Sequence, residues 1–221
     1  MYVHASNFRD LVPNPKSSLC DTENLSIICA VAIGDRMENK MKLLICSDIH
    51  GDLESCEKAL EAFEREGADK LLLLGDILYH GPRNDLPPTY APKEVIALLN
   101  PMKSKIIAVR GNCDAEVDQM VLDFPIMADC ARLELDGLSV LATHGHHYNT
   151  ATPPPLAKGE IMLHGHTHVL KIEEFGDENF YINPGSVSLP KEGNPRSYAV
   201  YEDRRFTIKD LFGGVILEKQ F

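Results

Sequence analysis

The sequence predicts a layered α/β fold. Short apolar runs alternate with amphipathic stretches in the first half of the chain, and short strand-like runs dominate the second half. Strands that alternate with helices are typical of a sheet covered by helices, with functional sites at the strand ends. A length of 221 residues suits one domain with a sizeable core.

The regular alternation begins at Met41 and continues through the first half of the chain. The first expected helix has apolar residues at a spacing of three to four, which places them on one face. The second begins at Pro92, and proline is tolerated in the first turn of a helix. We expect strands over 43–46, 71–74 and 106–109, and helices over 52–66 and 92–99.

After about residue 125 the helical pattern fades and short strands dominate. Asp136-Gly137 is a strong signal for a two-residue hairpin turn. We expect the second half to form a mostly antiparallel sheet that faces the first. Its strands are expected over 131–135, 138–143, 161–163, 169–175, 180–182, 198–201, 206–211 and 215–218.

Residues 1–40 differ from the rest, with mixed polarity, closely spaced prolines and no sustained helical or strand period. We interpret 1–40 as a poorly ordered N-terminal extension or the result of a start codon assigned too early, since Met41 stands directly before a core strand. Residues 41–221 are then the functional domain.

Charge and composition restrict the class of partner. The net charge of -11 disfavours a nucleic-acid partner, because proteins bind nucleic acids through clustered Lys and Arg. A small anionic substrate that binds at a locally positive site is still compatible with this charge. No apolar run approaches the roughly 20 residues needed to cross a bilayer. The six cysteines are scattered, which favours reduced thiols. We expect a cytoplasmic protein without membrane contacts.

Residue types that bind metals follow the expected strands. A single Asp after a strand is usually a helix N-cap, and a single His is more often a core or surface residue than a ligand. Those ordinary roles give no reason for all of them to stand at strand ends that a compact sheet brings together. The candidate metal ligands are Asp48, His50, Asp76, Asn112, His144, His166 and His168.

The spacing of these residues fits a metal centre. In extended backbone, Asp48 and His50 leave the chain on the same face, and so do His166 and His168. Mixed carboxylate and imidazole ligands suit Mn, Fe or Zn better than Mg or Ca. Seven ligands exceed the needs of one ion, so two divalent ions are implied.

The sequence resembles the calcineurin-like metallophosphoesterases. Five blocks carry the resemblance, in the family's order, and it covers Met41 to about residue 215. The family implies a four-layer sandwich of two central β-sheets flanked by helices, known as the metallo-dependent phosphatase fold. The blocks are Asp48-Ile49-His50, Gly75-Asp76, Gly111-Asn112, Thr143-His144-Gly145-His146 and Gly165-His166-Thr167-His168.

Further motifs resemble the YfcE-type bacterial phosphodiesterases, namely 80–84, 110–114 and 183–188. On that resemblance one ion is held by Asp48, His50 and His168, Asp76 bridges both ions, and the second ion is completed by Asn112, His144 and His166. The ions are expected to be Mn²⁺, with Ni, Fe or Zn as alternatives. A homo-oligomer is also in keeping with the family.

The implied reaction is hydrolysis of a phosphate ester by a hydroxide that bridges ions about 4 Å apart. In the wider family a His follows the Asn ligand, whereas here Cys113 follows Asn112. A neutral thiol is a poor acid at pH 7 and offers no positive charge to a dianionic monoester. We therefore favour a small phosphodiester as the substrate.

Several alternatives stay open at this point. Cys113 is equally well interpreted as a small buried residue, and His146 could supply the missing acid. Arg83, in a Pro-rich loop, is a weaker candidate for substrate binding, and Asn183 with Ser186 is expected to shape an ordinary turn beside the metals. The rival functions are a phosphomonoesterase, a nucleotide pyrophosphatase, or a non-catalytic scaffold like a retromer coat subunit of similar fold.

Overall fold

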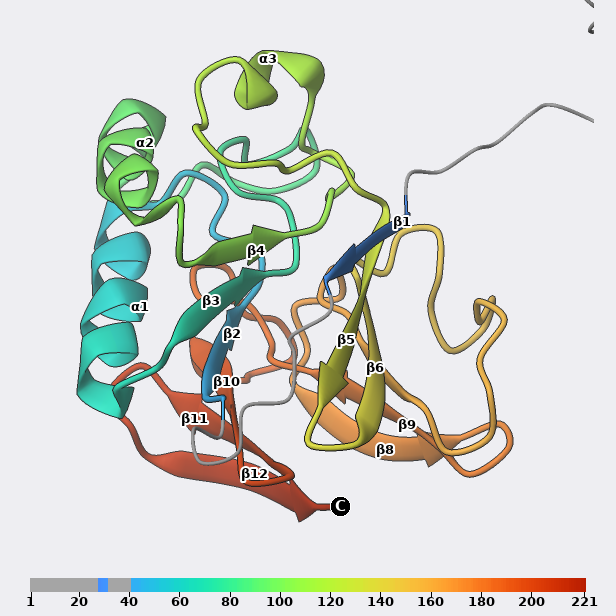
Figure 1. Ribbon diagram of the computed structural model, residues 1–221. Helices are drawn as coiled ribbons and strands as arrows, with labels where there is room; N and C mark the ends of the chain where they lie inside the picture. The colour runs from blue at the N-terminus through green and yellow to red at the C-terminus, as the bar shows by residue number, and fades with distance from the viewer. Residues whose placement is uncertain (1–27, 32–40) are drawn as a thin grey trace, which may run out of the picture.

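The computed structural model describes residues 28–31 and 41–221. Within them the chain forms two six-stranded sheets that pack against each other (Figure 1). Sheet A has the order β1 (Ile28–Val31), β5 (Cys130–Leu135), β6 (Leu138–Thr143), β7 (Ile161–Leu163), β9 (Asn179–Asn183) and β8 (Lys171–Phe175). Sheet B has the order β12 (Val215–Gln220), β11 (Arg205–Asp210), β10 (Ser197–Glu202), β2 (Leu43–Cys46), β3 (Lys70–Leu73) and β4 (Ile106–Ala108).

Sheet B is the middle layer because its central strands are apolar on both faces. In β2, Leu44 packs into the core beneath the helices, whereas Leu43 and Ile45 pack into the core between the two sheets. All four residues of β2 are buried. A strand that is buried on both faces has a continuous apolar sequence, and that explains the run that opens the regular part of the chain.

The outer face of sheet B is covered by α1 (Leu53–Glu66) and α2 (Pro92–Leu99). Asp52 caps α1 by accepting a hydrogen bond from the backbone N–H of Ser55, and Gly67 ends the helix in the left-handed conformation. Both helices were expected from the sequence. The structure adds a 3-10 turn at Asn100–Met102 and the short helix α3 (Glu116–Gln119). None of the described helices is long and apolar enough to cross a membrane.

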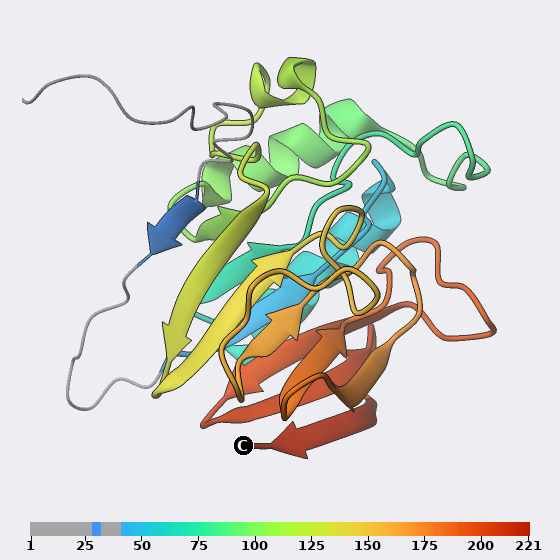
Figure 2. The ribbon, with the colours of Figure 1, turned by 90° about the vertical axis from the view of Figure 1, so that its right-hand side faces the viewer.

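The two-sheet α/β architecture expected from the sequence is confirmed. Figure 2 looks onto the outer face of sheet A, and no described helix covers that face. The hairpin at Asp136-Gly137 is also confirmed, since β5 and β6 pair antiparallel on either side of it. The helical layers of the described chain therefore lie on the side of sheet B.

The expectation of one mostly antiparallel sheet in the second half was wrong. Sheet A is mixed, because β6 pairs with β7 and β7 with β9 in parallel. The last three strands, β10 to β12, join sheet B instead, where β10 pairs antiparallel with β2. Tyr198 of β10 packs into the core beneath the helices, and Tyr201 packs into the core between the sheets. β10 is therefore buried on both faces, which a position inside sheet B allows.

The predicted N-terminal extension, 1–40, lies outside the described residues except for 28–31. The exception is β1, which pairs in parallel with β5, with Ile28 beside Cys130. The sequence analysis found no strand in this region.

Candidate metal centre

The seven predicted ligand residues converge at one edge of the two sheets. Asp48 and His50 follow β2, Asp76 follows β3, and Asn112 follows β4. His144 follows β6, while His166 and His168 follow β7. Sheet B supplies four of the residues and sheet A supplies three, so the cluster forms only because the two sheets pack face to face.

One group consists of Asp48, His50 and His168. The Asp48 Oδ1 atom lies 3.2 Å from His168 Nε2 and 3.7 Å from His50 Nε2. The two Nε2 atoms are themselves 3.2 Å apart. All three residues are buried, and their ligand atoms are close enough to hold one metal ion.

The remaining residues form a second group. His144 Nε2 lies 3.1 Å from Asn112 Oδ1 and 3.2 Å from His166 Nδ1. Asp76 lies between the two groups, because its Oδ2 atom is 3.5 Å from His144 Nε2 and 3.8 Å from His50 Nε2. This arrangement fits two ions that share the Asp76 carboxylate.

Each carboxylate has one oxygen held by the protein and one directed at the histidines. Asp48 Oδ2 accepts hydrogen bonds from the Ser47 hydroxyl and the His166 N–H, whereas Oδ1 is buried without a hydrogen-bond partner in the described chain. Asp76 Oδ1 accepts a hydrogen bond from the Cys113 N–H. An unpartnered buried carboxylate oxygen is costly unless a cation binds it.

Backbone carbonyls fix the histidine rings. Nδ1 of His50 donates to the Tyr79 carbonyl at 2.8 Å, and Nδ1 of His144 donates to the Leu74 carbonyl at 2.6 Å. His168 donates in the same way to Leu189. With the proton on Nδ1, a neutral imidazole presents the lone pair of Nε2, as in the outer hydrogen bonds of metal-bound histidines. These donor atoms therefore suit a metal ion.

Charge interactions keep the centre anionic before any metal binds. Burial disfavours the charged form of Asp48, but the nearby imidazoles of His168, His144 and His50 lower its pKa well below the usual range. Burial likewise disfavours protonation of His144, yet Asp76 and Asp48 outweigh it and raise the pKa of His144 to about 9. The carboxylates thus favour a positive charge beside them, either on a protonated histidine or on a bound metal ion.

The backbone around the ligands is not extended, contrary to the sequence interpretation. Asp48, His50 and Asp76 have φ values of 57°, 53° and 54°, and His166 and His168 have 65° and 61°. Residues other than glycine rarely adopt this left-handed conformation, and such positions cluster at functional sites. Sharp turns after the strands therefore aim the ligands inward.

Two glycines permit the close approach of these turns. A Cβ atom on Gly111 would overlap the carboxylate and backbone of Asp76, and one on Gly165 would overlap the side chains of Ser47 and Asp48. Glycine is required at both positions because the backbone passes directly against a ligand.

Sequence reasoning assigned no role to Asp114, a buried carboxylate beneath the ligands. Its Oδ2 accepts hydrogen bonds from the backbone N–H groups of Asp76 at 2.8 Å and Gly111 at 2.7 Å, and its Oδ1 accepts one from Ile77 at 2.9 Å. The signal was present in the sequence, since Asp114 is the last residue of the motif 110–114 and stands two positions after the ligand Asn112. One side chain thus joins the turn after β3 to the turn after β4.

Ser186 and Asn183 lie beside the ligand turns, as the sequence analysis expected. The hydroxyl of Ser186 donates to the Asp48 carbonyl at 2.9 Å, and Ser188 donates to the same oxygen at 2.7 Å. Asn183 donates to the Gly165 carbonyl. The segment 183–188 therefore supports the metal-binding turns from β9.

Cys113 lines the pocket above the cluster and is only half-buried, so its interpretation as a small buried residue is not supported. Burial and then the nearby Asp76 carboxylate raise the pKa of its thiol, which stays protonated. The other described cysteines, Cys46, Cys56 and Cys130, are also free thiols.

His146 packs behind the cluster, with its ring centroid 5.4 Å from that of His144, and it is not among the residues that line the pocket. Burial and then the neighbouring histidines lower its pKa to about 4. His146 is therefore neutral at pH 7, which weighs against the expected role as an acid.

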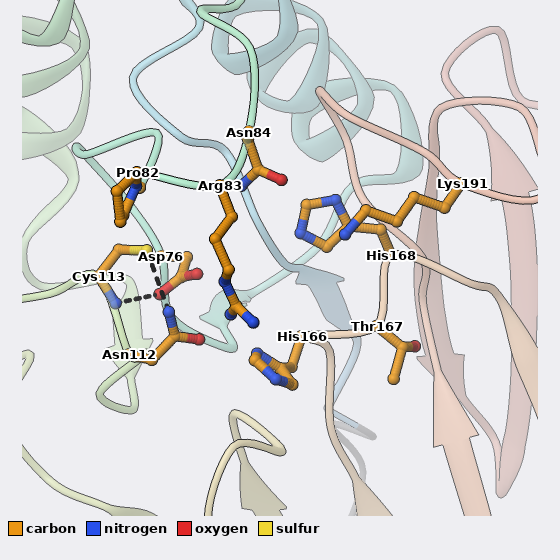
Figure 3. A pocket seen from close by; sticks show the side chains of 11 residues that line it. Asp76, Pro82, Arg83, Asn84, Asn112, Cys113, His166, Thr167, His168 and Lys191 are labelled. Atoms are coloured by element: carbon orange, nitrogen blue, oxygen red, sulfur yellow. Dashed lines mark hydrogen bonds between the residues drawn. The ribbon is translucent and has the colours of Figure 1, made fainter.

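The pocket above the ligands has a volume of about 360 Å³. In Figure 3 the side chain of Arg83 extends from above toward Asn112 and His166, and the side chain of Lys191 extends from the right toward His168. The lining of the pocket is mainly polar, which suits a hydrophilic anion better than an apolar ligand.

Residues 41–204 match the family model of the calcineurin-like phosphoesterase superfamily domain. The chain is 49% identical over 163 residues to the phosphodiesterase YfcE of Escherichia coli strain K12, a match that covers 74% of this chain and 88% of the relative. It is 29% identical over 153 residues to the phosphodiesterase MJ0936 of Methanocaldococcus jannaschii, covering 66% and 83% of the two chains.

Solved structures agree with these sequence matches. The structure of Yfce, described as a phosphoesterase from E. coli, superimposes with a TM-score of 0.78 at 46% identity and covers 81% of this chain and 98% of that one. An archaeal phosphodiesterase with a TM-score of 0.54 and 22% identity, covering 80% and 100% of the two chains, has the same fold.

Proposed function

Because the chain belongs to the calcineurin-like phosphoesterase superfamily, we propose that it is a dinuclear metal-dependent phosphodiesterase that hydrolyses a small phosphodiester. The observation that supports this most is the position of Asp76 between two groups of buried ligand atoms. The phosphodiesterase named among its relatives, at 49% identity, supports the same reaction class.

In this proposal Asp48, His50 and His168 hold one ion, Asn112, His144 and His166 hold the other, and Asp76 bridges them. Divalent ions at such sites lower the pKa of bound water and offset the charge of a phosphoryl group. Manganese is the expected ion, with Ni, Fe or Zn as alternatives, because the ligands mix carboxylate and imidazole.

The protein's own groups orient and bind the substrate. Asn112 lines the pocket, where its amide nitrogen is 3.1 Å from the Cys113 sulfur. The protonated Cys113 thiol is small and uncharged, so it leaves room for the second ester group of a diester and offers no charge to a monoester dianion. We assign no proton transfer to His146, since a neutral imidazole is not an acid.

The alternatives are a phosphomonoesterase or nucleotide pyrophosphatase, and a non-catalytic scaffold. All seven ligand positions hold a residue type that binds metals, which favours an enzyme over a scaffold. A cytoplasmic location, a homo-oligomer and the exclusion of nucleic acid and membrane partners stay predictions from the sequence, as does the division of the chain at residue 41.

The proposal is tested with the purified full chain and bis(p-nitrophenyl) phosphate. Hydrolysis is expected with added Mn²⁺ and not after chelation, and Asp76→Ala is expected to abolish it with unchanged circular dichroism. Asp123→Ala, at an exposed aspartate that pairs with Lys103, is the matched control. If neither Mn²⁺, Ni²⁺, Zn²⁺ nor Mg²⁺ supports cleavage of any diester, the scaffold alternative gains.

A further inference from the structure

Two basic side chains, Arg83 and Lys191, line the pocket above the metal centre. In Figure 3 the guanidinium of Arg83 points between Asn112 and His166, while Lys191 extends from a separate loop toward His168. The two cations therefore border the space in which a substrate would meet the ligand cluster.

Neither cation is neutralised by the protein. In the described part of the chain, no ion pair or side-chain hydrogen bond is found for Arg83 or Lys191. Asp76 is the one carboxylate among the described residues that line this pocket. Two unpaired cations in one pocket are notable in a chain with a net charge of -11, and they create a locally positive field there.

The backbone holds Lys191 beside a metal ligand. Its N–H donates to the His168 carbonyl at 3.1 Å, and its carbonyl accepts hydrogen bonds from the backbone and side-chain nitrogens of Asn194 at 3.1 and 2.8 Å. The same loop supplies the Leu189 carbonyl that fixes the His168 ring. The lysine thus starts from a defined position at the rim, and only its flexible stem is free to move.

The loop that carries Arg83 is also tied to the site. Asn84 donates from its side chain to the His80 carbonyl at 2.8 Å, and Gly81 packs directly against the Cys113 sulfur. Arg83 lies near enough to His166 to add to the lowering of that residue's pKa, of which burial is the main cause. A guanidinium in this place can bind two oxygens of one phosphoryl group.

The positive charge of the pocket exceeds the single negative charge of a simple phosphodiester. If the proposed function holds, two divalent ions, the carboxylates of Asp48 and Asp76 and the attacking hydroxide leave a net charge of one plus, and Arg83 and Lys191 raise it to three plus. A diester phosphate carries a single negative charge. The excess favours a substrate with a further anionic group.

We propose that the pocket takes phosphodiesters whose alcohol part carries a second anionic group, such as a phosphate. Arg83 binds the phosphoryl group that is cleaved, and Lys191 at the rim binds the second anionic group. This inference rests on the proposed function and specifies its substrate class.

Two matched substrates test the role of Lys191. Thymidine 5′-(p-nitrophenyl phosphate) and its 3′-phosphorylated form release the same p-nitrophenolate and differ only in the added phosphate. For the unmodified enzyme we expect kcat/KM to be about three- to tenfold higher with the 3′-phosphate, the range of one hydrogen bond at a solvent-accessible position. Lys191→Ala is expected to give equal kcat/KM values for the two substrates. Lys158→Ala, at an exposed lysine paired with Glu178, is expected to retain it.

A binding measurement separates this inference from the catalytic proposal. Calorimetric titration of the Mn²⁺-loaded protein compares thymidine 3′,5′-bisphosphate with thymidine 5′-phosphate, and the same three- to tenfold preference is expected to disappear in Lys191→Ala. Failure to cleave either nitrophenyl substrate or bis(p-nitrophenyl) phosphate would reject the proposed function, while the binding ratio would still decide the role of Lys191. Equal affinities in the unmodified protein, or a preference that survives Lys191→Ala, would overturn the inference.

Discussion

The Nε2 atoms of His50 and His168 lie 3.2 Å apart, and both lie within 4 Å of the Asp48 Oδ1 atom. Both rings donate from Nδ1 to backbone carbonyls, and the unpartnered Oδ1 of Asp48 faces the same point. Lone pairs that converge in a buried place repel one another unless a cation lies among them. The cluster therefore suits a metal ion, and we expect the folded chain to gain stability when it binds one.

Metal binding is therefore expected to raise the melting temperature. An ion at about 100 times its Kd stabilises the fold by about 2.7 kcal/mol, which corresponds to roughly 5–10 °C for a chain of this size. Addition of Mn²⁺ to chelator-treated protein is checked by calorimetry or thermal-shift fluorescence. His168→Ala is expected to lose much of the shift, while His147→Ala, at an exposed histidine of the same chain, keeps it. Equal shifts in both variants would contradict the assignment of His168.

Replacement of Asp114 by Asn is expected to weaken both the fold and the reaction. The carboxylate accepts three buried backbone N–H groups, and an amide nitrogen would face one of them as a second donor. We expect the free energy of unfolding to fall by about 2–4 kcal/mol and kcat to fall at least about tenfold at saturating metal. Denaturant titrations and steady-state kinetics measure these effects.

Asp123→Asn is the control for Asp114→Asn, because that carboxylate is exposed and pairs only with Lys103 in the described chain. A loss of stability in Asp114→Asn with kcat unchanged would show that Asp114 supports the fold without positioning Asp76.

Restoration of a histidine at position 113 is expected to shift the substrate preference. The Cys113 thiol lies within 4.8 Å of the ligand atoms of His50 and Asp76, so an imidazole there would reach the pocket. We expect Cys113→His to raise the ratio of p-nitrophenyl phosphate to bis(p-nitrophenyl) phosphate hydrolysis by about tenfold, since a protonated imidazole can meet a dianion and assist a leaving group. Cys113→Ser serves as the matched variant of similar size. An unchanged ratio would remove Cys113 as the basis of the preference for diesters.

Glu66 links stability to pH at a distance from the metal centre. Burial raises the pKa of its carboxyl, but hydrogen bonds from Lys209 at 2.9 Å and Tyr198 at 2.8 Å outweigh burial and lower it. A carboxyl whose folded pKa is depressed stabilises the fold above its unfolded pKa of about 4.3, and this contribution is lost as pH falls through the folded value.

Glu66→Gln is therefore expected to lower the free energy of unfolding by about 1 kcal/mol at pH 7, with the difference shrinking below about pH 4. Urea titrations between pH 3 and pH 7 measure it. A difference that stays constant over this range would mean that packing, and not charge, accounts for the effect.

Much of the fold could be predicted because local patterns determine it. The helix that starts at Leu53 and the hairpin at Asp136-Gly137 depend on spacing and turn chemistry within a few residues. The pairing of β10 with β2 joins Ala199 to Ile45, more than 150 positions apart, and no local pattern specifies such a partner. That is why the last three strands were assigned to the wrong sheet.

The metal-ligand residues could likewise be predicted from their places after the strands, but their geometry could not. The sequence suggested extended backbone at Asp48 and His50, whereas both adopt positive φ in a turn held by long-range contacts. Lys191 escaped notice because an isolated lysine in a loop has no pattern. Only the fold brings it beside His168.

The bridging position of Asp76 is the central claim, and anomalous diffraction from crystals of the Mn²⁺-bound protein tests it most directly. We expect two anomalous peaks about 4 Å apart, with Asp76 Oδ2 in contact with both. Asp48, His50 and His168 are expected on one side, and Asn112, His144 and His166 on the other. A single peak in the cluster, or two peaks of which Asp76 contacts only one, would contradict it.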